Sequence, residues 1–600
     1  MTSNESRIEQ LIAEMTPVEK IGQMTQASNE AITPREVADL SIGSVLSGGN
    51  GNPTPNNPSV WANMVGSFVE AAGQTRSGIP LVYGVDAVHG HSNVGGATIF
   101  PHNIGLGAAG DEDLVERIGQ ATATEMRATG IRWTFAPTVA VPQDIRWGRT
   151  YEGYGRDPEL VALLGSALVR GLQGSGEGPL SVLACAKHFV GDGATTWGTA
   201  PRFSWEHWWD GWGDSWQIDQ GDARISEQEL RSIHLRPYLA ALEAGAMTVM
   251  ASYNSWNGEK LHAHHGLLTG VLKEELGFRG FVVSDWMGVD QIDSDYETSV
   301  VRAINAGVDM VMVPEDYLRF IEVMTRVTAS GRIPVQRIDD AVRRILRAKH
   351  AAGLFDPEPT APTLSVVGSM EHRSLAAEAV RRSAVLLKND RALPIPAGIK
   401  SIEVAGTAAD DIGLQCGGWT VGWQGGLGRT TAGTTLLDGL RASSPHQIEF
   451  DPSGDFSSPD RPEIGIVCIA EPPYAEGPGD RATPTASDED RAIFARMRER
   501  ADVLVLVVYS GRPLVIPDLI AQADAVVAAW LPGSECATLG EMLSGLHPFE
   551  ARTSQPWPRS FEALADPDQT PLYPTGHGLS PTAAVAGRNA KTTPPEQVND

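Results

Sequence analysis

The chain has 600 residues, 42% of them hydrophobic, and its 47 Lys and Arg against 74 Asp and Glu give a formal net charge of −27. This length predicts two to four domains unless one of them is a large α/β barrel. So strong a negative charge repels phosphate backbones and anionic lipid headgroups, which argues against nucleic acid and membrane surfaces as partners.

The first residues and the cysteines bear on the cellular compartment. The start, MTSNESRIEQLIAEM, is polar and amphipathic, so it predicts no signal peptide and a cytoplasmic location; a periplasmic or secreted protein that has lost its leader would look the same. No stretch is long and apolar enough to span a bilayer. Four cysteines are no disulfide framework, and we expect Cys185 and Cys468, inside apolar runs, to be buried free thiols. Nothing in the sequence indicates the oligomeric state.

Residues 40 to 350 alternate short apolar runs with amphipathic segments of helical length, a pattern typical of βα units around a parallel sheet. Seven or eight such units predict an α/β protein whose first domain, over residues 1–355, is a (β/α)8 TIM-like barrel. The strands are expected at 42–49, 81–90, 131–141, 182–192, 248–258, 281–289 and 308–314.

A second, smaller domain is predicted after a Pro-rich linker over residues 356–370. A helical pattern runs through MEHRSLAAEAVRRSAVLLKND, and apolar strands alternate with helices up to residue 580, which predicts an α/β sandwich over 371–580. Its strands are expected at 401–406, 463–471, 501–511 and 523–534. Residues 581–600 lack periodicity and are expected to be a disordered tail.

Polar side chains follow the apolar part of four predicted barrel strands. A single Asp in this place could simply cap the next helix. In α/β barrels, however, the carboxyl ends of the strands form the open mouth where chemistry takes place. Four such strand ends therefore favour a functional site, and they carry Asp86 and His89, Lys187 and His188, Tyr253 and Asn254, and Asp285 and Trp286.

The chemistry of these residues suits a neutral polyol. Carboxylates, a lysine, histidines and an arginine, Arg149 or Arg146, can fix hydroxyl groups, and aromatic rings can pack on a sugar face. The sequence contains no dinucleotide or Walker fingerprint and no C-x-x-C or H-E-x-x-H spacing. We therefore expect no cofactor and no metal.

Nine motifs identify a resemblance to a known family. They are YGVDAVHGH, WGRTYEGYG, AKHFVGDG, MASYNSWNG, GFVVSDWMGVD, QCGGWTVGWQG, EPPYAEGPGD, YSGRPLVI and AAWLPGSE. In these the chain resembles glycoside hydrolase family 3, nearest the bacterial β-glucosidases and plant-type exo-β-glucanases, in register from about residue 5 to about 580. The resemblance implies retaining hydrolysis that releases terminal β-glucose from β-linked gluco-oligosaccharides or β-glucosides, in a pocket between barrel and sandwich.

The resemblance also implies the roles of individual residues. Asp285 corresponds to the nucleophile and Glu476 to the general acid/base, whereas Glu471 is expected to orient or support the loop. A retaining mechanism needs two carboxyl groups about 5–5.5 Å apart. Because a general acid must be protonated near neutral pH, we expect the pKa of Glu476 to be raised.

The remaining pocket residues also come from the resemblance. Five side chains correspond to those that hydrogen-bond the sugar hydroxyls, and Met250 to a residue of the pocket floor. Trp286 and Trp419 correspond to a pair that clamps the next sugar, which favours tolerance for several linkages because stacking reads ring faces. The five hydroxyl-binding residues are Asp86, Arg149, Lys187, His188 and Tyr253.

Three departures qualify the resemblance. Gln220 and Gln291 stand where the plant enzymes carry a Glu and an Arg, and the end of the sandwich, HPFEARTSQPWPRSFEAL, departs from the usual pattern. A tryptophan-rich insertion at 197–216 could be a self-packed surface loop, an aromatic wall for the leaving group, or a subunit contact.

Two other functions stay open. The β-N-acetylglucosaminidase branch reads K-H-F-P-G-H-G where this chain has KHFVGDG, and a carbohydrate-binding protein without hydrolysis would be marked by loss of Asp285 or Glu476. Transglycosylation would use the same residues as hydrolysis. The linkage preference is not fixed by the sequence.

Overall fold

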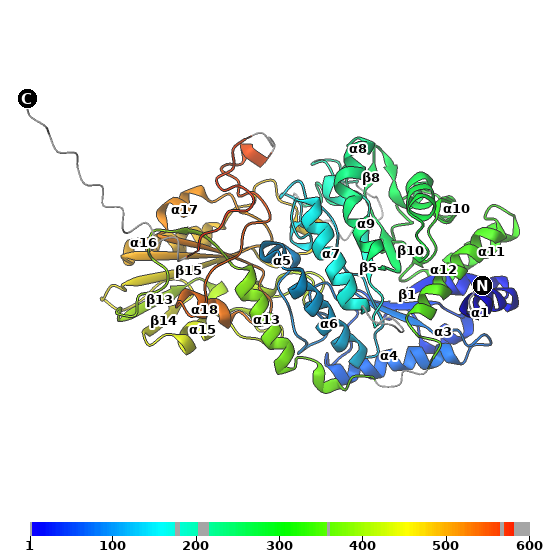
Figure 1. Cartoon of the computed structure of the whole chain (residues 1–600), viewed down its shortest axis with the longest axis horizontal. Helices are drawn as coiled ribbons and strands as arrows, with labels where there is room; N and C mark the ends of the chain where they lie inside the picture. Colours follow the sequence, from blue (N-terminus) through cyan, green and yellow to red (C-terminus); the bar gives the residue numbers. More distant parts are fainter. Residues whose placement is uncertain (1–2, 175–180, 202–214, 357–360, 565–568, 581–600) are drawn as a thin grey trace, which may run out of the picture.

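The computed structural model describes residues 3–174, 181–201, 215–356, 361–564 and 569–580. Two domains lie side by side, an N-terminal barrel and a C-terminal sandwich (Figure 1). The central part of the tryptophan-rich insertion, four residues of the linker and the expected tail lie outside the described residues, so the predictions for them are not tested here.

Eight parallel strands form the barrel, which confirms the predicted fold. One sheet has the order β11-β1-β2-β3-β4 and a second the order β10-β7-β5. Parallel bridges from Trp133 to Leu183 and from Val283 to Met310 join the two sheets and close the ring. The strands are β1 Thr25–Ser28, β2 Ser44–Ser47, β3 Val82–Val85, β4 Trp133–Thr134, β5 Cys185–Phe189, β7 Thr248–Ala251, β10 Phe281–Val283 and β11 Val311–Met312.

Amphipathic helices surround the barrel, and several begin at strong caps. Thr16 and Thr33 each form a capping box with a Glu three residues later and are followed by Pro at the first helical position. The helices are α1 Ser3–Glu14, α2 Pro17–Gln23, α3 Pro34–Leu40, α4 Pro58–Gly73, α5 Asn103–Ala109, α6 Glu112–Ala128, α7 Pro158–Gln173, α8 Glu227–Glu229, α9 Arg236–Glu243, η6 Gly266–Glu275, α10 Tyr296–Ala306, α11 Tyr317–Ala329 and α12 Val335–Ala351.

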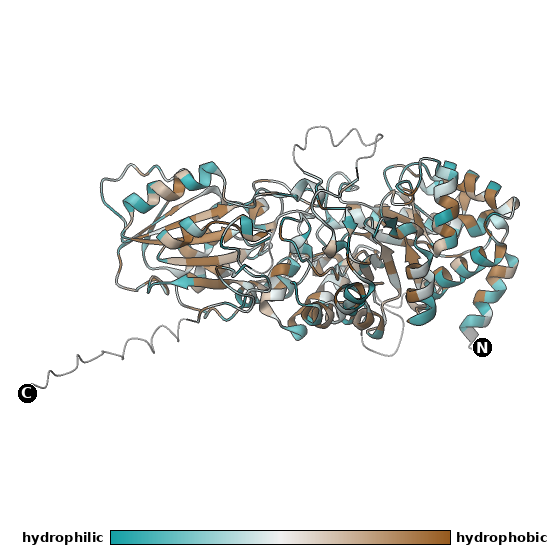
Figure 2. Cartoon of the chain, turned by 90° about the horizontal axis from the view of Figure 1, so that it is seen from above, coloured by the Kyte–Doolittle hydropathy of each residue, from teal (hydrophilic) through white to brown (hydrophobic). Residues whose placement is uncertain are grey.

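The sandwich contains a six-stranded sheet of order β12-β17-β16-β15-β13-β14, with only β12 antiparallel to its neighbour. Its apolar strands lie inside, and the outer helices carry hydrophilic residues (Figure 2). The elements are α13 Met370–Ser383, β12 Val385–Asn389, β13 Ser401–Ala405, α14 Ile412–Cys416, α15 Leu436–Ser443, β14 Gln447–Asp451, β15 Ile464–Ala470, α16 Asp488–Arg500, β16 Val503–Tyr509, α17 Pro517–Gln522, β17 Ala525–Trp530 and α18 Ala537–Leu543.

Three of the differences from the sequence-based expectation have a clear physical reason. The first barrel strand, TQAS, was not predicted because it contains only one apolar residue, although all four of its residues are buried. The helical pattern after residue 370 ends at Ser383, and the buried run that follows is strand β12. Strand β14 was also not predicted, because it is a partly exposed edge strand that lacks an apolar run.

The two domains share an apolar interface. One buried cluster contains barrel side chains such as Val88, Ile104 and Tyr151 together with Val385 and Trp530 of the sandwich. The four cysteines are buried and free, which confirms the expectation for Cys185 and Cys468. No helix among the described residues is long and apolar enough to cross a membrane.

Candidate active site

A cavity of about 520 Å³ opens where the carboxyl ends of the barrel strands face the sandwich. All ten residues predicted for the site line it, although they come from seven separate stretches of sequence. Eight are from the barrel and two from loops of the sandwich. They are Asp86, Arg149, Lys187, His188, Met250, Tyr253, Asp285, Trp286, Trp419 and Glu476.

Asp285 lies just beyond β10, with its carboxylate held by the local backbone. Its Oδ1 accepts a hydrogen bond from Trp286 N at 2.7 Å, and its own N–H donates to His262 Nε2 at 3.0 Å. Oδ2 accepts no hydrogen bond from the described residues. Burial raises the pKa of Asp285 to about 6, against the opposing charges of Arg149 and Lys187. The side chain is therefore mostly ionised at neutral pH, with one oxygen free to react.

Glu476 reaches the same cavity from a sandwich loop that follows β15. Arg149 Nη1 donates to its Oε1 at 2.9 Å. Burial raises the pKa of Glu476 to about 8; Arg149 opposes this shift, and the carboxylates of Asp219, Asp285 and Glu152 add to it. A carboxyl group that stays protonated at neutral pH can act as a general acid.

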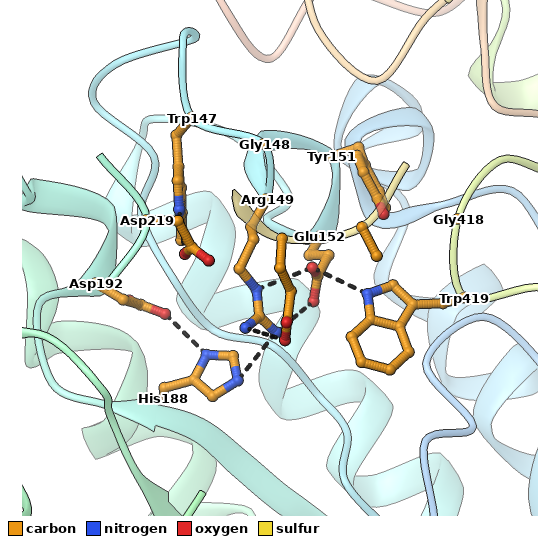
Figure 3. Close-up of polar contacts among 12 residues, drawn as sticks. Trp147, Gly148, Arg149, Tyr151, Glu152, His188, Asp192, Asp219, Gly418 and Trp419 are labelled. Carbon is orange, nitrogen blue, oxygen red and sulfur yellow. Dashed lines mark hydrogen bonds and ion pairs between the residues drawn. The ribbon is translucent and has the colours of Figure 1, made fainter. Parts of the chain in front are cut away.

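Arg149 is a shared cation at the centre of the site (Figure 3). Its Nε and Nη2 donate to both oxygens of Glu152, each at 2.9 Å, and Trp419 Nε1 donates to Glu152 Oε1 at 3.1 Å. Arg146, the other candidate arginine, pairs instead with Asp144 and does not line the cavity. Sequence reasoning gave Glu152 no role, although the R-x-x-E spacing was visible in RTYEG.

The tautomer of His188 is fixed by its hydrogen-bond partners. One of them is Asp192, to which the sequence analysis gave no role. The Nδ1 of His188 lies 2.9 Å from Asp192 Oδ2, and its Nε2 lies 3.1 Å from Arg149 Nη2 (Figure 3). Because the carboxylate can only accept and the guanidinium can only donate, Nδ1 carries the proton and Nε2 accepts. Burial and the charge of Arg149 lower the pKa of His188, so the ring is neutral, with Nε2 3.7 Å from Asp285 Oδ2.

Asp86 and Lys187 form an ion pair at the cavity wall. Lys187 Nζ donates to Asp86 Oδ1 at 3.1 Å and lies 5.5 Å from the centre of the Trp419 ring. Burial raises the pKa of Asp86, and Lys187 opposes that shift. The pair presents acceptor and donor groups together, which suits a ligand with neighbouring hydroxyls.

Aromatic rings form much of the outer wall. A Cβ atom on Gly48 would lie 2.9 Å from the Trp286 ring, and one on Gly49 would lie 2.6 Å from Trp423 Cβ. The glycines after β2 therefore allow both tryptophans to pack closely against the barrel loop. Trp423 and Trp216 also line the cavity. Trp423 was not predicted, although it was visible in QCGGWTVGWQG, and Trp216 ends the insertion for which an aromatic wall was one of the open alternatives.

Gln220 and Gln291, the two departures from the plant pattern, both line the cavity. Gln291 Nε2 donates to Gln220 Oε1 at 2.9 Å, and Lys260 Nζ donates to Gln291 Oε1 at 3.0 Å. Tyr253, on the same side, donates from its hydroxyl to Trp286 O at 2.6 Å. A neutral amide pair thus stands in place of a charged one.

Backbone strain concentrates around this cavity. Five of the ten non-glycine residues with positive φ in the described chain line it. Such conformations cost roughly 1–3 kcal/mol each and persist only where the surroundings hold them. The five are Trp216, Gln220, Met287, Trp419 and Glu476, with φ between 52° and 62°.

Glu471 lies away from the cavity, in an ion pair below the acid loop. Arg512 Nε donates to its Oε1 at 3.0 Å, while Tyr474 Oη and Gly511 N donate to Oε2 at 2.9 and 3.1 Å. This geometry fits the expected supporting role. Among the described residues no group of three or more His, Cys, Asp or Glu side chains is arranged to hold a metal ion.

Comparisons with protein families match nearly the whole chain. The model described as glycosyl hydrolase family 3 N terminal domain matches residues 16–202 and 209–348, and the one described as glycosyl hydrolase family 3 C-terminal domain matches 384–581. A lysosomal beta glucosidase of Dictyostelium discoideum is 31% identical, over 97% of this chain and 76% of that protein.

Solved structures give the same picture. A mutant of exo-1,3/1,4-beta-glucanase from a Pseudoalteromonas species superposes with a TM-score of 0.89 at 40% identity, covering 97% of this chain and 96% of that one. A mutant beta-glucosidase from Listeria innocua in complex with laminaribiose superposes with a TM-score of 0.81 at 25% identity, covering 97% and 83%.

Proposed function

The chain belongs to glycoside hydrolase family 3, among its exo-acting β-glucosidases and exo-β-glucanases, and from that premise we propose that it is a retaining enzyme releasing terminal β-D-glucose from β-1,3- and β-1,4-linked gluco-oligosaccharides. The observation that carries the proposal is the contrast between two carboxyl groups in one cavity. Asp285 is mostly ionised at neutral pH with a free oxygen, and Glu476 is mostly protonated.

These two carboxyl groups would divide the reaction into two displacements. Asp285 Oδ2 attacks the anomeric carbon while the glycosidic C–O bond breaks and Glu476 gives its proton to the leaving oxygen. Glu476, now a carboxylate, takes a proton from water, whose oxygen attacks the anomeric carbon and breaks the bond to Asp285. Glucose leaves with the β configuration, and both residues return to their first state.

The cavity wall supports a glucose-sized polyol. The Asp86–Lys187 pair offers a hydroxyl both an acceptor and a donor, and the remaining N–H of Arg149 Nη1 adds one more donor. Trp286 and Trp423 flank the mouth, where a second sugar could stack. The Listeria innocua relative is in complex with laminaribiose, and the Pseudoalteromonas relative is an exo-1,3/1,4-beta-glucanase, which supports these two linkages.

The geometry does not favour the β-N-acetylglucosaminidase alternative. In KHFVGDG the position that carries a histidine in that branch is Asp192, which binds His188 Nδ1 and does not line the main cavity. The acid role is available instead to Glu476. A β-glucosidase is therefore the better interpretation of this site.

The test compares the wild type with Asp285→Asn on 4-nitrophenyl β-glucoside, laminaribiose, cellobiose and sophorose. Glucose release by the wild type alone is expected, with laminaribiose and cellobiose ahead of sophorose. Proton NMR of the first-formed sugar should show the β anomer. A wild type that is inert on all four substrates would contradict the proposal, and α-glucose as first product would contradict the retaining mechanism.

A further inference from the structure

The segment that returns from the tryptophan-rich insertion docks on the loop of the acid/base. Trp216 N donates to Gly477 O at 3.0 Å, and Ser215 Oγ donates to Pro478 O at 3.3 Å. The Trp216 ring covers Gly477 so closely that a Cβ atom there would lie 2.1 Å from it. Whatever the rest of the insertion does, this end of it forms one wall around Glu476.

A buried carboxylate holds the two segments together through hydrogen bonds. Asp480, at the end of the acid loop and 1% exposed, accepts from Gly148 N on Oδ1 at 2.8 Å. Its Oδ2 accepts from the three successive backbone amides of residues 217–219, each at 2.9 Å. Four donors to one carboxylate fix the position of the segment relative to the acid loop and to the barrel.

These hydrogen bonds place Asp219 close to the acid/base loop. Asp219 is 3% exposed, and its Oδ1 accepts from Trp147 Nε1 at 2.8 Å. Figure 3 shows Asp219 under the edge of Trp147 and next to the Arg149 guanidinium. Its Oδ2 has no hydrogen-bond partner among the described residues, and Asp219 lines a second, small cavity of about 10 Å³, about the size of one water molecule.

We propose that Asp219 is a positioning residue for the acid/base: its main-chain N–H binds Asp480 of the acid loop, its carboxylate binds Trp147, and its negative charge keeps Glu476 as the protonated member of a pair of carboxyl groups. The inference rests on the proposed function, because it presumes that Glu476 is the proton donor. It gives the insertion's returning end a part in proton transfer that neither a surface loop nor a sugar-binding wall would have.

The donors around the two carboxyl groups decide which of them keeps the proton. Burial raises the pKa of both Asp219 and Glu476. The charge of Arg149 is the largest influence that lowers the pKa of both groups, and Asp219 in addition accepts the indole N–H of Trp147, whereas Glu476 accepts only from Arg149 among the described residues. Because Asp is also the stronger acid of the two side chains, Asp219 ionises first and its charge opposes the ionisation of Glu476.

Every charged element packed around Glu476 is consistent with this order. Arg149 is the one cation among the described residues that forms an ion pair with it; Arg512 and Arg481 bind main-chain oxygens of the same loop. His188, which contacts Arg149, is neutral. The carboxyl groups that raise the pKa of Glu476 are Asp219, Asp285 beyond β10 and Glu152 of the 150–152 turn.

The test is the pH dependence of kcat/KM on methyl β-glucoside, a slow-leaving alkyl glucoside, for wild type and Asp219→Asn. The asparagine keeps an acceptor for Trp147 but removes the charge. We expect the basic limb of the kcat/KM profile to move about one pH unit toward lower pH, which lowers kcat/KM about fivefold at pH 8, while the acidic limb does not move. On 4-nitrophenyl β-glucoside, whose leaving group needs little protonation, the loss in kcat/KM at pH 8 should be less than twofold.

Asp222→Asn is the matched control, because Asp222 lies on the same segment but pairs with Arg224 and Gly258 N. Its profile should match the wild type. An active wild type whose basic limb is unchanged in Asp219→Asn, or moves equally in the control, overturns the inference alone; a wild type without glucosidase activity overturns the proposed function. Asp219→Ser carries the same expectation if the asparagine variant fails to fold, and unfolding of both would make Asp219 structural only.

Discussion

The site has two halves that are held in different ways. Asp285 and His188 of the barrel half sit in or just beyond strands, where neighbouring strands fix the backbone. Trp419 and Glu476 of the sandwich half sit on loops in left-handed conformations, at φ 57° and 58°. Their positions depend on bonds that cross between domains, such as that from the Arg149 guanidinium to Glu476. The position of the nucleophile is therefore fixed by a sheet, and that of the acid by contacts between the two domains.

The largest effect should come from the barrel half. Asp285→Asn leaves the hydrogen bond from Trp286 N in place but removes the nucleophile, so kcat should fall on the order of 10⁴-fold or more on every glucoside. Steady-state kinetics on aryl and alkyl glucosides measure this loss. Asp293→Asn, in the loop that follows, should keep wild-type activity. A residual rate within tenfold of wild type would assign the nucleophile elsewhere.

Loss of the acid should separate substrates by leaving group. Glu476→Ala removes the proton donor, so methyl β-glucoside should lose roughly 10²–10⁴-fold, while the first step on an activated aryl glucoside should lose far less. The pre-steady-state burst of 4-nitrophenol compares the two steps directly, because the second step also needs the base. Equal losses in the first step on both substrates would move the acid role away from Glu476.

The domain contact itself can be weakened at Arg512, which is fully buried. Its guanidinium donates to Gly479 O in the acid loop and to Arg146 O in the barrel, as well as to Glu471. Arg512→Met leaves Glu471 as an uncompensated buried charge, which should cost about 3–5 kcal/mol of unfolding free energy. Activity on alkyl glucosides should fall more than on aryl glucosides, because the acid loop is displaced and the nucleophile is not.

A matched control for Arg512 is Arg498, which pairs with Asp524 at 2.8 Å on the partly exposed side of the same domain. Arg498→Met should lower the free energy of unfolding by less than about 1 kcal/mol and leave the activity on both substrates unchanged. Denaturant unfolding and the two rates are measured for both variants. Parallel loss of aryl and alkyl activity in Arg512→Met would show that the two halves of the site are not held independently.

The same contrast explains what the sequence could predict. Asp86, Lys187 and Asp285 follow apolar runs, so the rule for strand ends in α/β barrels found them without reference to any relative. Trp419 and Glu476 follow no such rule, because their place depends on how two domains meet across more than 300 residues of sequence. Only the resemblance to a known family assigned them.

Other residues were missed for reasons that are physical. Glu152, Asp192 and Asp219 act through partners, and a side chain's partner is not visible until the chain is folded. The strand β1 was missed because TQAS is buried by its neighbours while being polar itself, held by bonds such as that from Gln26 Nε2 to Ser44 Oγ. Local patterns predict elements with apolar faces and fail where burial is satisfied by polar pairing.

The smallest predicted effect concerns stability. An Asp whose folded-state pKa is raised contributes its full stability below its unfolded pKa of about 3.9 and loses it as the pH rises through the folded pKa, here about 6. Ionised Asp285 should therefore cost the fold about 1–3 kcal/mol at pH 7.5, which Asn, neutral at every pH, avoids.

Thermal unfolding measures this cost directly. The midpoint of Asp285→Asn should equal that of wild type near pH 3, below the unfolded pKa, and exceed it by a few degrees at pH 7.5, whereas Asp293→Asn should show the same small difference at both pH values. If the difference in unfolding midpoint between Asp285→Asn and wild type does not change with pH, ionisation of the buried carboxylate costs the fold no stability. A difference in midpoint that opens between about pH 4 and 6 would show that the barrel half holds its charged nucleophile at the expense of stability, as a site built for reaction requires.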